Sequence, residues 1–118
     1  MSSRPRSAAA FRRASRLLPG GVDSPVRACK AVGTTPVFLQ WGSGARVADV
    51  DGHLYPAYVG SWGPLVLGPA DPGVVQPVAK RAASGLTFGA CVEREADLAE
   101  EVRDAFPSCE RIRFVTSG

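Results

Sequence analysis

The chain has 118 residues and a mass of 12.4 kDa, which is enough for one small domain. Hydrophobic residues make up 45% of it and charged residues 21%, values near the globular average that exclude disorder along the whole length. No apolar run approaches the roughly 20 residues needed to cross a bilayer, so the sequence predicts no transmembrane helix.

The formal net charge of +3 is concentrated at the start of the chain. Residues 1–16 contain five arginines and no acid, whereas the other 102 residues carry nine basic and eleven acidic side chains. Nucleic-acid binding requires basic side chains on a folded face, with aromatic residues among them. Because the body of the chain lacks this pattern, no nucleic-acid partner is expected.

A helix is predicted after an irregular basic terminus at residues 1–6. Ser7 suits its N-cap, and Pro19-Gly20-Gly21 ends it. Apolar residues recur at helical spacing on one face: Ala10, Phe11, Ala14, Leu17 and Leu18. The acid-free start is also typical of an organelle transit peptide, and this alternative stays open. There is no secretory apolar region, so the cytoplasm is the expected compartment.

Three short strands are predicted after a loop at residues 20–30. Residues 36–41, 45–50 and 53–55 have strand-like composition or alternation. Asp51-Gly52 favours a tight hairpin turn, because glycine tolerates the positive φ that such turns need. The sequence therefore predicts a small antiparallel meander.

Two further helices are predicted beyond a Gly- and Pro-rich loop at residues 56–72. The first has Asp71 as N-cap and Pro72 as its first residue, and it runs to about Ser84 with a kink at Pro77. The second has acids in its first turn and an apolar stripe, and it ends before Pro107. Its stripe consists of Leu98, Ala99, Val102, Ala105 and Phe106.

The last residues predict the beginning of an anion site. Residues 111–115 are predicted to form a strand, and a turn of small residues follows it. In α/β units, the amides of such a turn and of the next helix bind phosphate. The chain is thus expected to hold a helix and meander segment at 7–65 and the incomplete start of a larger domain at 66–118.

No metal site is expected. Cys29, Cys91 and Cys109 are widely spaced with no C-x-x-C pair, and His53 is the only histidine. The cysteines are predicted to be reduced thiols.

Several motifs together resemble the N-terminal part of the glutamate-1-semialdehyde 2,1-aminomutases, which are pyridoxal-phosphate (PLP) enzymes of the class III aminotransferase type. The most specific matches are Gly20-Gly21-Val22 with Ser24-Pro25-Val26-Arg27, and Ser61-Trp62-Gly63-Pro64. Weaker ones are Asp51-Gly52 with Tyr55, Thr87-Phe88-Gly89, and Arg113 to Gly118. The resemblance runs from about Phe11 to Gly118.

The resemblance implies an α/β fold, namely the N-terminal part of a fold type I, aspartate-aminotransferase-like PLP-dependent transferase. That part comprises a helix, an antiparallel meander and the start of a large mixed or parallel sheet. The implied reaction converts (S)-4-amino-5-oxopentanoate to 5-aminolevulinate in porphyrin biosynthesis, by PLP-dependent transfer of an amino group within one molecule. A cytoplasmic homodimer acting on a small molecule is implied as well.

The resemblance also assigns roles to five residues. Arg27, with Ser24 beside it, would hold the substrate carboxylate, because a guanidinium fork matches a carboxylate. Trp62 would wall the substrate pocket, and Ser117 with Gly118 would begin the PLP phosphate cradle. No catalytic residue is expected within the chain.

The family's Schiff-base lysine lies far downstream. Neither Lys30 nor Lys80 has a matching context, so the chain alone is expected to be inactive.

Two departures from the family pattern are Pro69, where a histidine is usual, and Ala57, where an acid is common. Two alternatives remain. One is another class III enzyme, such as an ω-aminotransferase, against which the Ser24–Arg27 motif argues. The other is a non-catalytic, truncated remnant that keeps the front of the fold.

Overall fold

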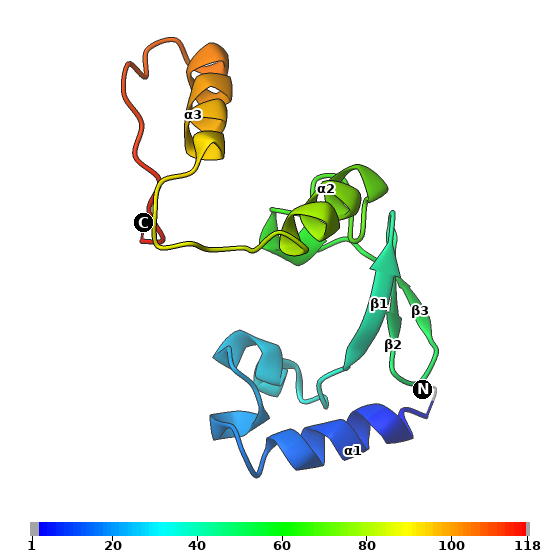
Figure 1. The fold of residues 1–118 in the computed structure, drawn as a ribbon. Helices are drawn as coiled ribbons and strands as arrows, with labels where there is room; N and C mark the ends of the chain where they lie inside the picture. The colour runs from blue at the N-terminus through cyan, green and yellow to red at the C-terminus, as the bar shows by residue number, and fades with distance from the viewer. Residues whose placement is uncertain (1–2, 118) are drawn as a thin grey trace. The chain divides into compact units, whose positions relative to one another are not determined.

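A computed structural model describes residues 3–117 (Figure 1). The chain divides into two compact units, Met1–Val78 and Ala79–Gly118. The first unit holds α1 (Pro5–Ala14), β1 (Leu39–Ser43), β2 (Arg46–Asp49) and β3 (Leu54–Pro56). It also holds four short 3₁₀ turns: η1 (Pro19–Gly21), η2 (Pro25–Ala28), η3 (Lys30–Val32) and η4 (Gly60–Trp62). Helix α2 (Pro72–Ala82) crosses the boundary, and α3 (Glu93–Ala105) lies in the second unit.

The three strands form the predicted antiparallel meander in the order β1-β2-β3. Trp41 pairs with Ala48, and Val47 pairs with Tyr55. The ladder begins at Leu39, later than the predicted start at residue 36. Beyond the paired residues of β1 and β2, the Val50 N–H donates to Phe38 O at 2.8 Å and extends this pairing by one bond.

Helix α1 begins at Pro5 with Arg4 at the N-cap position, three residues before the predicted cap, so the assignment of Ser7 as N-cap is wrong. Proline suits this first helical position because its missing N–H would have no helical partner. The helix amides of Arg6 and Ser7 donate instead to the Asp51 carboxylate, at 2.7 and 2.9 Å. The buried Ser7 hydroxyl accepts the Phe38 N–H at 3.3 Å. The cap is therefore supplied by a residue more than 40 positions away along the chain.

The end of α1 packs against a glycine. An ideal Cβ placed on Gly21 would lie 2.6 Å from Phe11 Cε2 and 2.7 Å from Ser15 Oγ, and the residue has a φ of +75°. Neighbouring Gly20 has a similar φ of +69°, and an added Cβ would meet nothing within 4 Å. Of these two glycines, Gly21 is therefore the one that combines close packing with a left-handed backbone.

This pair of glycines gives a matched prediction. Both Gly21→Ala and Gly20→Ala introduce left-handed strain, but only Gly21→Ala also forces Phe11 to move. We expect Gly21→Ala to destabilise the fold by about 1–3 kcal/mol more than Gly20→Ala does. Urea unfolding of the two variants measures the difference, and equal losses would contradict the packing argument.

The second and third predicted helices are confirmed. The Asp71 Oδ1 accepts the Gly73 N–H at 2.9 Å, as expected of the N-cap of α2, and Pro77 lies within this helix. Regular helix ends at Ala82 rather than at Ser84. Helix α3 ends just before Phe106 and Pro107.

The predicted strand at residues 111–115 is wrong. This segment forms neither helix nor strand in the described part of the chain. A strand requires a neighbouring backbone to bond its N–H and C=O groups, and the described residues provide none here. Phe114 and Val115 are correspondingly exposed.

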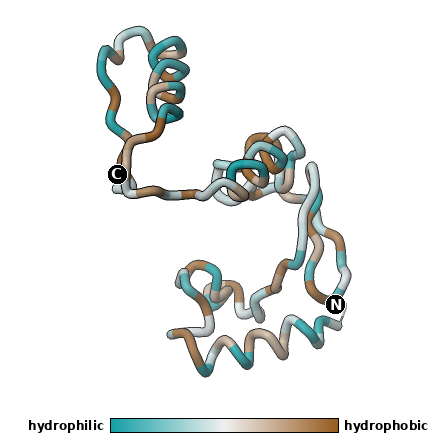
Figure 2. Tube along the Cα trace, in the orientation of Figure 1, coloured by the Kyte–Doolittle hydropathy of each residue, from teal (hydrophilic) through white to brown (hydrophobic). Residues whose placement is uncertain are grey.

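Most large apolar side chains lie at the surface. The fully buried hydrophobic residues among those described are Ala28 and Ala48. The largest fully buried side chains are polar, Ser7 and Asp49. Figure 2 shows that hydrophobic positions recur along the helices and loops of both units. Polar bonding rather than a large apolar core therefore organises the first unit.

No described helix is long and apolar enough to cross a membrane.

Candidate functional site

The buried Asp49 carboxylate organises the turn between β2 and β3. It accepts the backbone N–H groups of Asp51 (2.9 Å) and His53 (2.8 Å) and the Tyr55 hydroxyl (2.7 Å). His53 Nδ1 lies 3.0 Å from Asp49 Oδ2. An ionised carboxylate can only accept hydrogen bonds, so Nδ1 carries the proton in this pair.

Hydrogen bonding keeps Asp49 ionised. Burial alone raises the pKa of this carboxyl, but the bonds from Tyr55 and His53 outweigh burial and hold the pKa well below its usual range. The same Asp49 bond, followed by burial, raises the pKa of Tyr55. Four donors occupy the acceptor sites of one carboxylate, so Asp49 has a structural role rather than an acid–base one.

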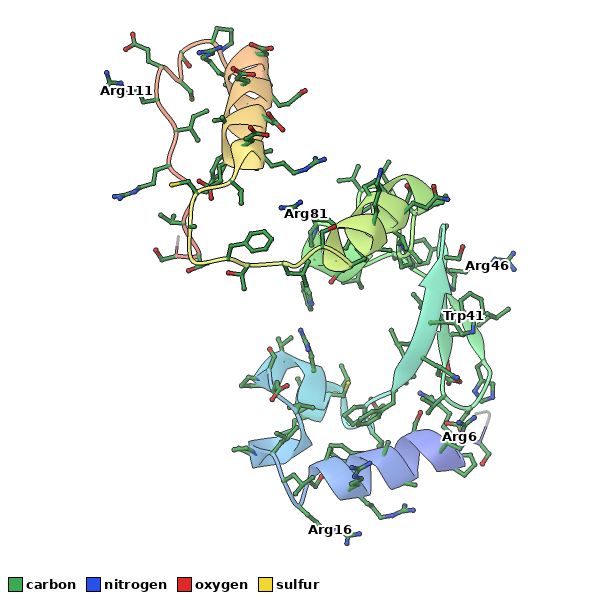
Figure 3. The ribbon with its side chains drawn as sticks, in the orientation of Figure 1. Arg6, Arg16, Trp41, Arg46, Arg81 and Arg111 are labelled. Atoms are coloured by element: carbon green, nitrogen blue, oxygen red, sulfur yellow. The ribbon has the colours of Figure 1, made fainter. Side chains whose placement is uncertain are left out.

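The sequence assigns Asp51 to a hairpin turn and to a family motif, and the structure shows in addition that its side chain joins the hairpin to α1. Burial raises the pKa of Asp51, but the amides of Ser7 and Arg6 outweigh this effect and lower it. The start of α1 lies beside the β2–β3 turn in Figure 1, and Figure 3 labels Arg6 at this place. The sequence does contain an indication of this link. Pro5 favours a helix start, and Arg4 before it makes no capping side-chain bond, so the first helix amides need an acceptor from elsewhere in the chain.

The two low carboxyl pKa values predict loss of stability in acid. In the pH range near 4 and below, the unfolded carboxyls bind protons more readily than Asp49 and Asp51 do in the fold. Their contribution is therefore complete above about pH 5 and is lost as the pH falls below about 4. We expect the thermal midpoint to be level from pH 7 to 5 and to fall at pH 3.

The control is Asp51→Asn, which should lower the midpoint at pH 6 and reduce its dependence on pH below 5. An unchanged midpoint of the parent protein between pH 6 and pH 3 would contradict the assignment.

A cleft of about 610 Å³ lies between the sheet and the loop at residues 57–69. The labelled Trp41 of β1 (Figure 3) and Val47 of β2 form part of the sheet side. Ser61 and Leu65 belong to the loop side. Because most of the lining is apolar, the cleft suits an apolar group.

The loop beside this cleft contains a run of left-handed backbone. Gly60, Ser61, Trp62 and Gly63 have φ values of 52°, 54°, 66° and 115°. This region costs roughly 1–2 kcal/mol for each residue with a side chain. The Gly60 carbonyl accepts the N–H groups of Gly63 and Leu65, both at 3.1 Å. Strain held in place by such bonds is common in functional segments, and here it presents an indole that is 73% exposed.

The structure places the predicted substrate-binding residues outside the cleft. Ser24 precedes η2 and is half-buried, while Arg27 lies in η2 with an exposed side chain. Within residues 3–117, no partner is recorded for the Arg27 guanidinium. Trp62 does not line the cleft, although its neighbour Ser61 does.

The predicted phosphate residues lie at the end of the second unit. Ser117 is exposed and borders a shallow cavity with Phe114, Val115 and Thr116. Gly118 lies outside the described residues.

The cysteines are free thiols; Cys29 is half-buried, and Cys91 and Cys109 are exposed. The described residues contain no cluster of His, Cys, Asp and Glu that could hold a metal ion.

The fold defines a class of protein. A solved structure described as a transaminase with PLP bound is 32% identical and superposes with a TM-score of 0.88, covering all of this chain and 27% of that one. An omega-transaminase from Sphaerobacter thermophilus is 33% identical with a TM-score of 0.83, over 95% of this chain and 25% of that one. The predicted fold class is thus confirmed, since the chain has the fold of a segment of the transaminases.

Within the transaminase class, sequence identity indicates which enzymes the chain resembles. Glutamate-1-semialdehyde 2,1-aminomutases from Rhodopirellula baltica, Polaromonas naphthalenivorans and Chloroflexus aggregans are 50%, 53% and 54% identical over 96–97% of the chain. The corresponding aminomutase structure from Pseudomonas aeruginosa PAO1 is 28% identical with a TM-score of 0.78, over 88% of this chain and 23% of that one. The predicted resemblance to the aminomutases is confirmed.

The chain spans about a quarter of the length of the curated relatives it matches, 26% in each of these three cases. It matches no protein-family profile.

Proposed function

We propose that the chain is part of a glutamate-1-semialdehyde 2,1-aminomutase, which converts glutamate-1-semialdehyde to 5-aminolevulinate in porphyrin biosynthesis. The observation that carries this proposal is identity of 50–54% to such enzymes over nearly the whole chain. Among the solved structures, the omega-transaminase is 33% identical and the Pseudomonas aeruginosa aminomutase is 28% identical, so these neighbours do not separate the two reactions. The similarity to the curated aminomutases favours an intramolecular amino transfer over transfer between two substrates.

In this proposal, Arg27 holds the substrate carboxylate and Ser24 assists it. The Arg27 side chain is exposed, and no partner within residues 3–117 is recorded for it, so its fork of donors is free for an anion. The Arg27 N–H donates to the Ser24 carbonyl at 2.9 Å, which keeps the two residues in one turn. Pro25 fixes the start of η2 between them. A short, bonded turn limits the entropy that the pair loses on binding.

Trp62 is proposed to form a wall of the substrate pocket. Its indole is largely exposed, and the left-handed backbone around it limits where the ring can lie. An aromatic ring held on a strained turn excludes water from one side of a small polar substrate. This role agrees with the aminomutase reading and does not itself select the reaction.

Pyridoxal phosphate is the proposed cofactor, and it supplies the electron-accepting ring on which amino groups are transferred. The described residues fit one part of it, because Ser117 offers an exposed hydroxyl that can donate to a phosphate oxygen. Lys30 and Lys80 are both exposed and line none of the described cavities. We therefore expect the lysine that binds the cofactor to lie outside residues 3–117.

The whole protein is proposed to be a cytoplasmic homodimer, with residues 7–65 as a helix and meander segment and 66–118 as the start of the large PLP-binding domain. Exposed apolar residues in both units support further burial in the assembled protein. Light scattering of the full-length protein tests the dimer, and a monomer at micromolar concentration would contradict it.

The reaction is tested with the full-length protein that contains this chain. The purified protein is loaded with pyridoxal phosphate and given glutamate-1-semialdehyde as its only substrate. Formation of 5-aminolevulinate without an added amino donor supports the proposal. A requirement for an external donor would support the ω-aminotransferase alternative, and no turnover of either kind would support the remnant.

A further inference from the structure

The β1–β2 hairpin approaches the far end of the 57–69 loop too closely for side chains. A Cβ on Gly68 would overlap the backbone carbonyl of Gly44. A Cβ on Gly42 would lie 2.6 Å from Pro69 Cγ and 3.1 Å from Val47 Cγ1. Gly42 has no positive φ, so the space around it rather than its backbone requires glycine.

The same hairpin holds the near end of the loop. The Ala57 N–H donates to the Ala45 carbonyl at 2.9 Å, which continues the β2–β3 ladder by one bond. Between the two ends, Leu65 N–H donates to Gly60 O and Gly68 N–H donates to Leu65 O, both at 3.1 Å. The loop is thus attached at both ends to one hairpin and braced internally.

We propose that this attachment positions Trp62, and that Gly68 and Pro69 are positioning residues for the substrate site. We call it the hairpin clasp, defined by Gly42, Gly44 and Ala45 on the hairpin and by Ala57, Gly68 and Pro69 on the loop. Its relevance to substrate rests on the proposed role of Trp62.

The clasp is needed because the backbone of the loop is strained. Ser61 and Trp62 both have left-handed backbone, and without a restraint these residues would relax to a more favourable conformation. The clasp fixes the distance between the loop ends, so the intervening residues cannot extend. Loosening either end therefore moves the Trp62 ring, and small displacements of a positioning group lower the efficiency of a reaction substantially.

The experiment compares two glycines of similar conformation in the full-length protein. Gly68 has a φ of +83° and meets backbone, whereas Gly52 has a φ of +91° and faces open space. Both Gly68→Ala and Gly52→Ala therefore introduce backbone strain, but only the Gly68→Ala methyl group clashes with the Gly44 backbone. Hydrogen exchange of the peptide covering residues 57–69 measures the loop directly, without any substrate.

We expect Gly68→Ala to speed exchange in this peptide by about tenfold and Gly52→Ala to leave it unchanged. In the aminomutase assay, Gly68→Ala should raise KM by about tenfold while kcat changes less than about threefold. Gly42→Ala should have a smaller effect of the same kind. Removing the opposing ring in Gly42→Ala/Pro69→Gly should restore part of the loss, a coupling expected only of residues in contact.

The outcomes separate the clasp from the proposed reaction. Equal hydrogen exchange in Gly68→Ala and Gly52→Ala would overturn the clasp whether or not the protein is an aminomutase. So would a Gly42→Ala/Pro69→Gly variant that recovers none of the loss caused by Gly42→Ala. Faster exchange with unchanged KM would overturn its role at the substrate site. If the parent protein shows no aminomutase activity, the proposed function fails while the exchange comparison still decides the clasp. Circular dichroism confirms that each variant is folded.

Discussion

In the proposed aminomutase, replacing Arg27 with alanine is expected to lower kcat/KM for glutamate-1-semialdehyde by about 100-fold or more. Each charge-assisted hydrogen bond to a carboxylate contributes about 1.5–3 kcal/mol, and the guanidinium can make two. Arg27→Lys keeps the charge but loses the planar fork, so we expect an intermediate loss of about tenfold. Steady-state kinetics with the purified variants measures both effects.

The control is Arg16→Ala, which removes an exposed arginine from the turn after α1. It should leave the kinetics unchanged, because general electrostatic attraction by the basic terminus would be shared among its five arginines. If Arg27→Ala and Arg16→Ala behave alike, Arg27 does not bind the substrate. A selective loss in Arg27→Ala would link η2 to carboxylate recognition.

Replacing Asp49 with asparagine is expected to have the largest effect on folding. Asparagine has nearly the same size, but it offers one acceptor oxygen and places an NH₂ group where donors converge. The Tyr55 hydroxyl and the His53 groups then compete for that oxygen, and buried donors without acceptors are costly. We expect the amides at residues 49–55 to lose at least about tenfold in hydrogen-exchange protection.

Asp23→Asn provides the comparison for Asp49→Asn. It removes the same charge from an exposed loop residue and should leave exchange in the hairpin unchanged. Undiminished protection at residues 49–55 in Asp49→Asn would show that the backbone ladder alone maintains the turn. Loss confined to this hairpin and to the start of α1 would confirm that the carboxylates join the two elements.

Much of the fold was predictable because the responsible signals are local. Asp51-Gly52 specifies its turn through the φ that glycine allows, and Asp71-Pro72 specifies the start of α2 through one side-chain bond and one missing N–H. The acids in the first turn of α3 and the proline after it act over the same short range. Each signal needs only a few neighbouring residues to have its effect.

The start of α1 was mispredicted because its cap comes from a distant residue. Ser7 has the residue type of an N-cap, yet the carboxylate of Asp51 reaches the first amides, and the Ser7 hydroxyl bonds to Phe38. The strand prediction for residues 111–115 was wrong for a different reason. Their composition suits a strand, but strand formation depends on a partner backbone, which composition does not encode.

The sequence alone was sufficient for the meander, the two later helices and the likeness to the aminomutases, since these depend on local conformational preferences and on residue identity. The folded structure was needed to show that Asp49 orders the β2–β3 turn, that Asp51 bonds this turn to α1, and that the hairpin closely approaches the Trp62 loop at Gly42 and Gly68. Hydrogen bonds and close packing between residues far apart in the chain depend on the spatial position of both partners. That position is produced by folding rather than by either local segment alone.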